Sequence, residues 1–159
     1  YIGVGETKYE PIKIKKIVVP SEIDGVKVTT IGIKYVNGDR FFYKGFGNPY
    51  VEEIVLPDTI VKIIGPSPYE IDCSHTGIFQ GCSNLKKINI PENMTYIANA
   101  AFKNCNSLKK IIIPSSVTEI GNWVFEGCDD IVATVKSGTS LTADDLKSAG
   151  IKEENIHFE

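Results

Sequence analysis

Apolar and polar side chains alternate along the chain in short stretches that recur at a fixed interval. Near residue 110, inward positions at Leu108, Ile111 and Ile113 are separated by outward positions at Lys110 and Ile112. This alternation is typical of a short strand with one buried face. A proline follows the stretch, and because it has no N–H to donate, it ends the strand. The same pattern lies 23 residues earlier. The sequence therefore predicts short, half-buried strands that return at a constant spacing.

Two other residue types keep the same interval of 23 residues. They are the phenylalanines and cysteines of the repeat, at Phe79, Phe102, Phe125, Cys82, Cys105 and Cys128. A period of about 20–29 residues with this spacing is typical of a leucine-rich repeat, in which stacked coils bury a shared core. The predicted fold class is a mainly β repeat solenoid: a right-handed leucine-rich repeat coil with 23-residue units, a parallel sheet on one face and a short C-terminal capping helix.

Five segments match the strand pattern, and we expect them to form one continuous, mainly parallel sheet. In order, they are Ile17–Val19, Ile54–Leu56, Ile88–Ile90, Ile111–Ile113 and Val132–Val135. A coil that always turns in one direction brings each segment back parallel to the one before it. For the same reason, Phe102 is expected to be fully buried between the phenylalanines of the neighbouring coils.

The repeats run along nearly the whole chain, which indicates a single domain over residues 1–159. Residues 1–13 are expected to form an N-terminal cap, residues 14–135 the repeats, and residues 136–159 a C-terminal cap. Insertions lengthen the repeats near residues 33–50 and 64–77. In the first of them, Asn37-Gly38 predicts a hairpin. Within a regular coil, Val117 and Ile120 are expected to turn the chain, with Gly121 as a permissive backbone at the corner.

The C-terminal cap carries its own helix and strand signals. Thr142 and Asp145 form a capping-box pattern before a short helix, and Gly150 is placed to end it. Ile156 and Phe158 then alternate as in an edge strand. A terminal unit of this kind would cover the open end of the solenoid.

The charge, the apolar runs and the absent motifs narrow the classes of function that this chain could have. The formal net charge of −3 provides no basic field for nucleic acid or an anionic membrane. No apolar run approaches the roughly 20 residues that span a bilayer. The motifs G-x-S-x-G and H-E-x-x-H and a phosphate-binding glycine loop are absent. We therefore expect no catalytic residues, no metal and no cofactor, although a carboxylate pair for glycoside hydrolysis stays open as an alternative.

The cysteines have more than one interpretation. The three repeat cysteines keep step with the phenylalanines, so we expect small buried side chains in a ladder. Cys73 lies in the second insertion, and a Cys73–Cys82 bridge is an alternative that would suit an extracellular loop. Cys73, His75 and Cys82 also suggest zinc, but a structural site needs four ligands and no fourth is evident. His75 is therefore expected at the surface.

The units LKKINIPENMTYIANAAFKNC and LKKIIIPSSVTEIGNWVFEGC closely resemble the BspA-like leucine-rich repeats. That family's pattern is roughly I-G-x-x-A-F-x-x-C-x-x-L-x-x-I-x-I-P-x-x-V-T, and the opening VVPSEIDGVKVTTIG is similar to its usual first coil. The resemblance covers Ile14 to about Val135. It implies an extracellular or cell-surface protein, mostly bacterial and often modular, with adhesion or host-protein binding as the usual assignment. A signal or anchor would lie outside this segment.

Two candidate binding surfaces contain large apolar residues without an inward role. The outward strand positions would present charged residues beside an aliphatic row, which often marks a binding surface; alternatively, β-branched residues simply favour strands. The aromatic-rich insertion offers interface anchors, unless its rings pack on their own coil. The predicted partner-binding residues are Val18, Val55, Ile112, Lys87, Lys110, Phe41, Phe42 and Tyr43.

The leading hypothesis is a non-enzymatic surface or secreted module for binding or adhesion. It would recognise a protein (host or matrix) or a glycan partner as a monomer, without binding nucleic acid and without inserting into a membrane through this segment. The alternative is a structural spacer domain of a larger modular surface protein, with no ligand of its own.

Overall fold

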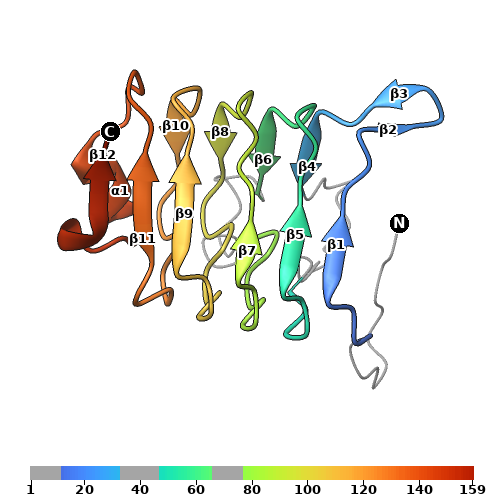
Figure 1. Ribbon diagram of the computed structural model, residues 1–159, viewed down its shortest axis with the longest axis horizontal. Coiled ribbons are helices and arrows are strands. Elements are labelled where there is room, and N and C mark those ends of the chain that lie inside the picture. Colours follow the sequence, from blue (N-terminus) through green and yellow to red (C-terminus); the bar gives the residue numbers. More distant parts are fainter. Residues whose placement is uncertain (1–11, 33–46, 66–76) are drawn as a thin grey trace, which may run out of the picture.

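The computed structural model describes residues 12–32, 47–65 and 77–159. The chain winds through successive coils, each of which contributes a strand to the front of the molecule in the view of Figure 1. These front strands are β1 (Lys16–Val18), β5 (Glu53–Val55), β7 (Lys87–Ile88), β9 (Lys110–Ile113), β11 (Val132–Val135) and β12 (Ile156–Phe158). Every hydrogen-bonded pair among them is parallel. The predicted mainly β repeat solenoid is confirmed.

The prediction of one continuous sheet is wrong, because the front strands form two three-stranded sheets. In hydrogen-bonded order they are β1-β5-β7 and β9-β11-β12. The strand β7 contains only Lys87 and Ile88 and therefore offers few backbone groups for pairing with β9. Beyond Ile88, contact with the preceding coil continues through the Asn89 side chain. The Leu56 N–H donates to Asn89 Oδ1 at 2.8 Å, and Asn89 Nδ2 donates to the Leu56 carbonyl at 2.7 Å.

A third parallel sheet, which was not predicted from the sequence, lies on the rear of the coils. It contains β4 (Thr30–Gly32), β6 (Lys62–Ile64), β8 (Tyr96–Ile97) and β10 (Glu119–Ile120), and Figure 1 shows these strands behind the front ones. Its register aligns one isoleucine from each coil: Ile31, Ile63, Ile97 and Ile120. The segment that was expected only to turn the chain is thus a short strand.

The repeat motif closes each coil through turns in which a backbone N–H donates to the carbonyl three residues earlier. The Cys105 N–H donates to the Phe102 carbonyl at 3.1 Å, and the Leu108 N–H donates to the Cys105 carbonyl at 2.9 Å. After the front strand, the Val117 N–H donates to the Pro114 carbonyl at 3.2 Å. The spacing F-x-x-C-x-x-L therefore corresponds to two consecutive turns. It places all three side chains in the core, where each is buried.

The phenylalanines form a column along the axis of the solenoid, as predicted. Phe102 has no exposed surface, and its ring centroid lies 5.4 Å from that of Phe79 and 5.6 Å from that of Phe125. In both pairs the ring planes differ by 11°. Rings at this distance gain dispersion and offset-stacking energy beyond the burial of their area. The column therefore joins successive coils into one core.

The predicted C-terminal helix and strand are confirmed as elements. The helix α1 (Ala143–Ser148) begins at Thr142, whose side chain accepts from the Asp145 N–H, while the Asp145 carboxylate accepts from the Thr142 N–H. It is followed by Gly150, at φ +95°, by the 3-10 turn η2 (Glu153–Asn155) and by β12. The Phe125 N–H donates to the Ala149 carbonyl at 2.7 Å. The end of the helix thus accepts an N–H from the last coil.

An antiparallel hairpin extends from the first coil near the N-terminal end of the solenoid (Figure 1). It consists of β2 (Glu22–Ile23) and β3 (Val26–Lys27). Asp24 and Gly25 between them both have positive φ, at 51° and 78°, as a type I′ turn requires. This hairpin was not predicted from the sequence, although an Asp-Gly pair is a strong hairpin signal. The hairpin that it predicted at Asn37-Gly38 lies outside the described residues.

Candidate binding surface

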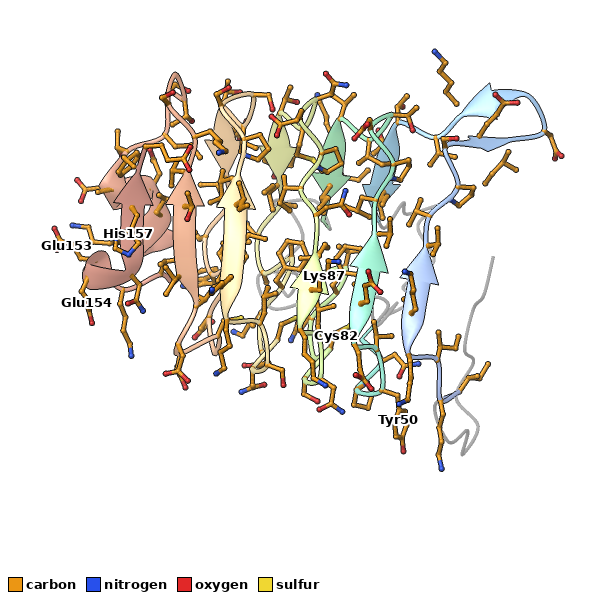
Figure 2. The ribbon with its side chains drawn as sticks, in the orientation of Figure 1. Tyr50, Cys82, Lys87, Glu153, Glu154 and His157 are labelled. Carbon is orange, nitrogen blue, oxygen red and sulfur yellow. The ribbon has the colours of Figure 1, made fainter. Side chains whose placement is uncertain are left out.

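The front face is defined here as the outward side of β1, β5, β7, β9, β11 and β12. In β9, the side chains of Ile111 and Ile113 are buried, while Lys110 and Ile112 are exposed. The strand register that the sequence predicted is therefore right, and outward residues of neighbouring strands form rows across the face. Figure 2 shows Lys87 on β7, near the middle of these strands.

One row of the front face is rich in aliphatic side chains. Val18 and Ile112 are 62% and 54% exposed, and Val55, which is paired with Val18 in the strand register, is half-buried. The exposed Asn89 lies in the coil between Val55 and Ile112. The row therefore consists of an aliphatic pair at one end and a separate isoleucine, with a polar amide between them.

The neighbouring row carries ion pairs that link successive coils. Glu53 lies between two lysines, with Lys16 Nζ at 3.0 Å and Lys87 Nζ at 3.7 Å from its carboxylate. The hydrogen bond from Lys16 is the main cause that lowers the pKa of the Glu53 carboxyl. Exposed pairs of this kind contribute little to stability. Their effect is to fix lysine side chains at defined places on the front face.

A second set of ion pairs involves the residues that directly precede Lys16, Glu53 and Lys87. Glu52 contacts Lys15 at 3.2 Å and Lys86 at 3.0 Å, and the hydrogen bond from Lys86 is the first cause that lowers the pKa of its carboxyl. Farther along, Lys109 contacts Asp130 at 2.7 Å. This set was not among the sequence predictions.

The aromatic part of the candidate surface is only partly described. Phe41, Phe42 and Tyr43 lie outside the described residues. Tyr50, at the end of the same insertion, is 38% exposed, and Lys13 Nζ lies 5.9 Å from its ring centroid, within cation–π range. Figure 2 shows Tyr50 near the edge of the solenoid at which β5 begins.

Other exposed apolar residues escaped the sequence analysis. Ile23 and Val26, which face each other across the β2–β3 hairpin, are 57% and 69% exposed. Trp123 is 40% exposed and has φ +57°, a region that bulky residues rarely occupy. The Asp-Gly signal could have indicated the hairpin pair. No sequence signal predicted the backbone conformation of Trp123.

The repeat cysteines form the buried ladder that the sequence predicted. Cys105 Sγ donates to the Phe79 carbonyl at 3.3 Å, and Cys128 Sγ donates to the Phe102 carbonyl at the same distance. Burial raises the pKa of the Cys105 thiol and raises that of Cys128 to about 11. Because only a thiolate attacks electrophiles readily, these side chains are chemically inert. Cys73 and His75 lie outside the described residues, so the alternative bridge and the zinc hypothesis stay untested.

We predict that Cys105 and Cys128 resist alkylation in the folded protein. Iodoacetamide at pH 8 should leave both unlabelled, since each is buried and protonated, whereas unfolding in guanidinium should expose both to complete labelling. Peptide mass spectrometry would report each cysteine separately, so labelling of Cys73 would not interfere. Rapid labelling of Cys105 under native conditions would contradict the buried ladder.

The described part of the chain offers no cluster of three or more potential metal ligands among His, Cys, Asp and Glu. Among the same residues, α1 is far too short and polar to cross a bilayer, and no helix qualifies as a membrane span. The described part of the front face carries exposed aliphatic side chains next to paired charges.

Comparison with known proteins agrees with the repeat geometry. A family model described as "BspA type Leucine rich repeat region (6 copies)" matches residues 40–142, more than half of the chain. No curated protein matches the sequence significantly. Proteins with repeats of this type are generally cell-surface proteins whose repeat domains take part in protein interactions and are generally not catalytic.

Several solved structures share the fold. A leucine-rich repeat protein of T. pallidum is 25% identical, with a TM-score of 0.53 over 78% of this chain and 59% of that one. A leucine-rich cell surface protein of Faecalibacterium prausnitzii is 23% identical, with a TM-score of 0.62 over 92% of this chain and 32% of that one. This chain thus spans between a third and three fifths of these two proteins. The repeat, the fold and the family match together show that the chain belongs to the BspA-type leucine-rich repeat family.

Proposed function

We propose that this chain is a non-enzymatic binding or adhesion module at the cell surface or in the extracellular medium. It acts as one repeat domain that recognises a protein or glycan partner through its front face. The observation that carries the proposal is the exposure of Val18 and Ile112 at outward strand positions, beside lysines that ion pairs hold in place. Aliphatic surface next to charge is typical of interaction sites.

The arrangement would suit a partner of moderate affinity. Aliphatic side chains on a rigid sheet lose little conformational freedom on binding, which lowers the entropic cost of association. The front-face lysines would add attraction at long range and orient the partner. The aromatic insertion, with Phe42 and Tyr43, would supply additional anchors.

The test is binding of the purified domain to an array of extracellular matrix proteins and mucin glycans. We expect a Val55→Lys/Ile112→Lys double variant to fold normally, because both side chains point outward, and to lose binding, because two charges would have to be desolvated at the interface. A matched control is Thr30→Lys/Thr118→Lys, which adds the same charges at exposed positions on the rear. A Phe42→Ala/Tyr43→Ala variant tests the insertion.

Each outcome of this experiment has a definite meaning. Binding that survives in both the Val55/Ile112 and the Phe42/Tyr43 variants would place the site elsewhere, on the rear of the coils or around Cys73 and His75. If the domain bound nothing in the array, the result would favour the alternative hypothesis of a structural spacer domain in a larger surface protein. Equal loss of binding in the rear control would indicate a nonspecific effect of charge.

A further inference from the structure

The front face from β1 to β9 is basic although the whole chain is acidic. Where these four strands begin, the face carries six lysines and two carboxylates, and a third carboxylate, Asp130, pairs with Lys109, whereas the chain as a whole has a net charge of −3. The lysines are Lys15, Lys16, Lys86, Lys87, Lys109 and Lys110, and the two carboxylates are Glu52 and Glu53. This part of the face therefore has an excess of positive charge, while acidic residues precede β11 and β12.

The excess is concentrated between β7 and β9, where opposite charges cease to alternate. Lys16, Glu53 and Lys87 alternate in sign along one row, but the same position of the next coil, 23 residues on, is Lys110. The two coils are in contact, because the Ser107 N–H donates to the Ser83 carbonyl and the Thr118 N–H to the Thr95 carbonyl, both at 3.1 Å. Two lysines at equivalent positions of stacked coils repel each other, whereas the opposite charges on β1, β5 and β7 attract.

Lys87 and Lys110 are also the least compensated lysines of this group. Lys86 has a carboxylate at 3.0 Å and Lys109 has one at 2.7 Å. Lys87 shares Glu53 with Lys16 and is the more distant of the two, at 3.7 Å against 3.0 Å. Within residues 12–32, 47–65 and 77–159, no ion pair involves Lys110.

The surroundings of these two lysines indicate what kind of group could neutralise them. Ile112 follows Lys110 by two residues on the same outward side of β9 and is 54% exposed. The exposed Asn89 holds the equivalent place beside Lys87, with its amide engaged by the Leu56 backbone. A ligand at this place would therefore meet positive charge next to an aliphatic surface, with no aromatic ring on either strand.

We propose that the junction of β7 and β9 binds an acidic segment of a partner protein. A carboxylate of that segment would lie between Lys87 and Lys110 and restore the alternation of charge, while an adjacent apolar side chain would cover Ile112. An aliphatic neighbour favours a peptide over an anionic glycan, whose hydroxyl groups gain nothing from Ile112. The inference rests on the proposed function and specifies the chemistry of its partner.

The first test uses a defined probe, a fluorescent peptide of alternating Glu and Leu, with matched Gln-Leu and Lys-Leu peptides. We expect anisotropy to show binding of the Glu peptide alone, weakened by about 0.5 M salt because exposed ion pairs are screened. Lys87→Gln/Lys110→Gln should weaken it by about 2- to 30-fold, the effect of two exposed ion pairs. The control Lys27→Gln/Lys62→Gln removes the same charge from β3 and the rear sheet and should have no effect.

A second variant separates binding from folding. In Lys110→Glu the alternation of charge that begins at Lys16 would continue into β9, so the melting temperature should rise by about 1–4 °C as repulsion becomes attraction. The same variant should bind the Glu peptide least of all. If Lys110 is retained for ligand binding, the folded protein is expected to be more stable with glutamate at this position than with its own lysine.

Three results would overturn the proposal. They are equal binding of the Gln and Glu peptides, undiminished binding in the Lys87/Lys110 variant, and binding of a heparin oligosaccharide but not of the Glu peptide. These failures are distinct from failure of the proposed function. If Val55→Lys/Ile112→Lys abolishes binding to a matrix protein while Lys87→Gln/Lys110→Gln does not, the front face binds its partner without this junction.

Discussion

A Phe102→Ala variant is expected to lose about 3–5 kcal/mol of unfolding free energy, the range for removal of a buried aromatic side chain. The ring is fully buried and has stacked neighbours on both sides. Those neighbours are fixed by the turns of their own coils, so the surrounding structure can close little of the cavity. Thermal and urea denaturation would measure the loss.

The control for this experiment is Phe158→Ala at the C-terminal edge of the same solenoid. That side chain is 50% exposed on the last strand, so its removal creates no enclosed cavity and should cost less than about 1.5 kcal/mol. If Phe102→Ala were as mild as the control, the phenylalanine column would not be the structural centre of the coils.

The second large effect is expected at Gly121, which should lose about 1–3 kcal/mol on replacement by alanine. A Cβ at this position would lie 2.4 Å from the Asn99 backbone nitrogen and 2.8 Å from the Ala98 carbonyl carbon. Backbone atoms of the preceding coil cannot move aside without breaking the hydrogen bond from the Gly121 N–H to the Ile97 carbonyl, 2.8 Å long. The neighbouring exposed Asn122→Ala should change stability by no more than about 0.5 kcal/mol.

This result would also correct the role first given to Gly121. Its backbone is not in the left-handed region, so conformational freedom is not the reason for glycine. The reason is the close approach of two coils at the rear corner. Chemical denaturation of Gly121→Ala and Asn122→Ala in parallel distinguishes the two explanations, and a Gly121→Ala variant as stable as the wild type would exclude crowding.

The parts of the fold that the sequence predicted are those that depend on local periodicity. The alternation around Ile111 and the interval between phenylalanines determine which side chains face inward, and the structure agrees at each. The capping box of α1 could also be predicted from the sequence, since Thr142 and Asp145 are three residues apart. Short-range patterns of this kind need no knowledge of the neighbouring coil.

The features that escaped prediction depend on contacts between coils. The rear strands contain only two or three residues and thus too few positions for a recognisable alternation. The Asn89 side chain bonds the backbone of Leu56, which lies 33 residues earlier in the sequence. The ion pairs of Glu52 join side chains from three different coils. For the same reason, the outward residues were identified while their charge partners were not.

The division of the front sheet has a mechanical consequence. At the junction of the third and fourth coils, a backbone ladder crosses the rear, where β8 pairs with β10, but none crosses the front between β7 and β9. Bending that opens the front at this place breaks no strand-to-strand hydrogen bond, whereas bending in the opposite direction must strain the rear ladder. We therefore expect bending about β8 and β10 that opens the front to cost less free energy than bending that opens the rear.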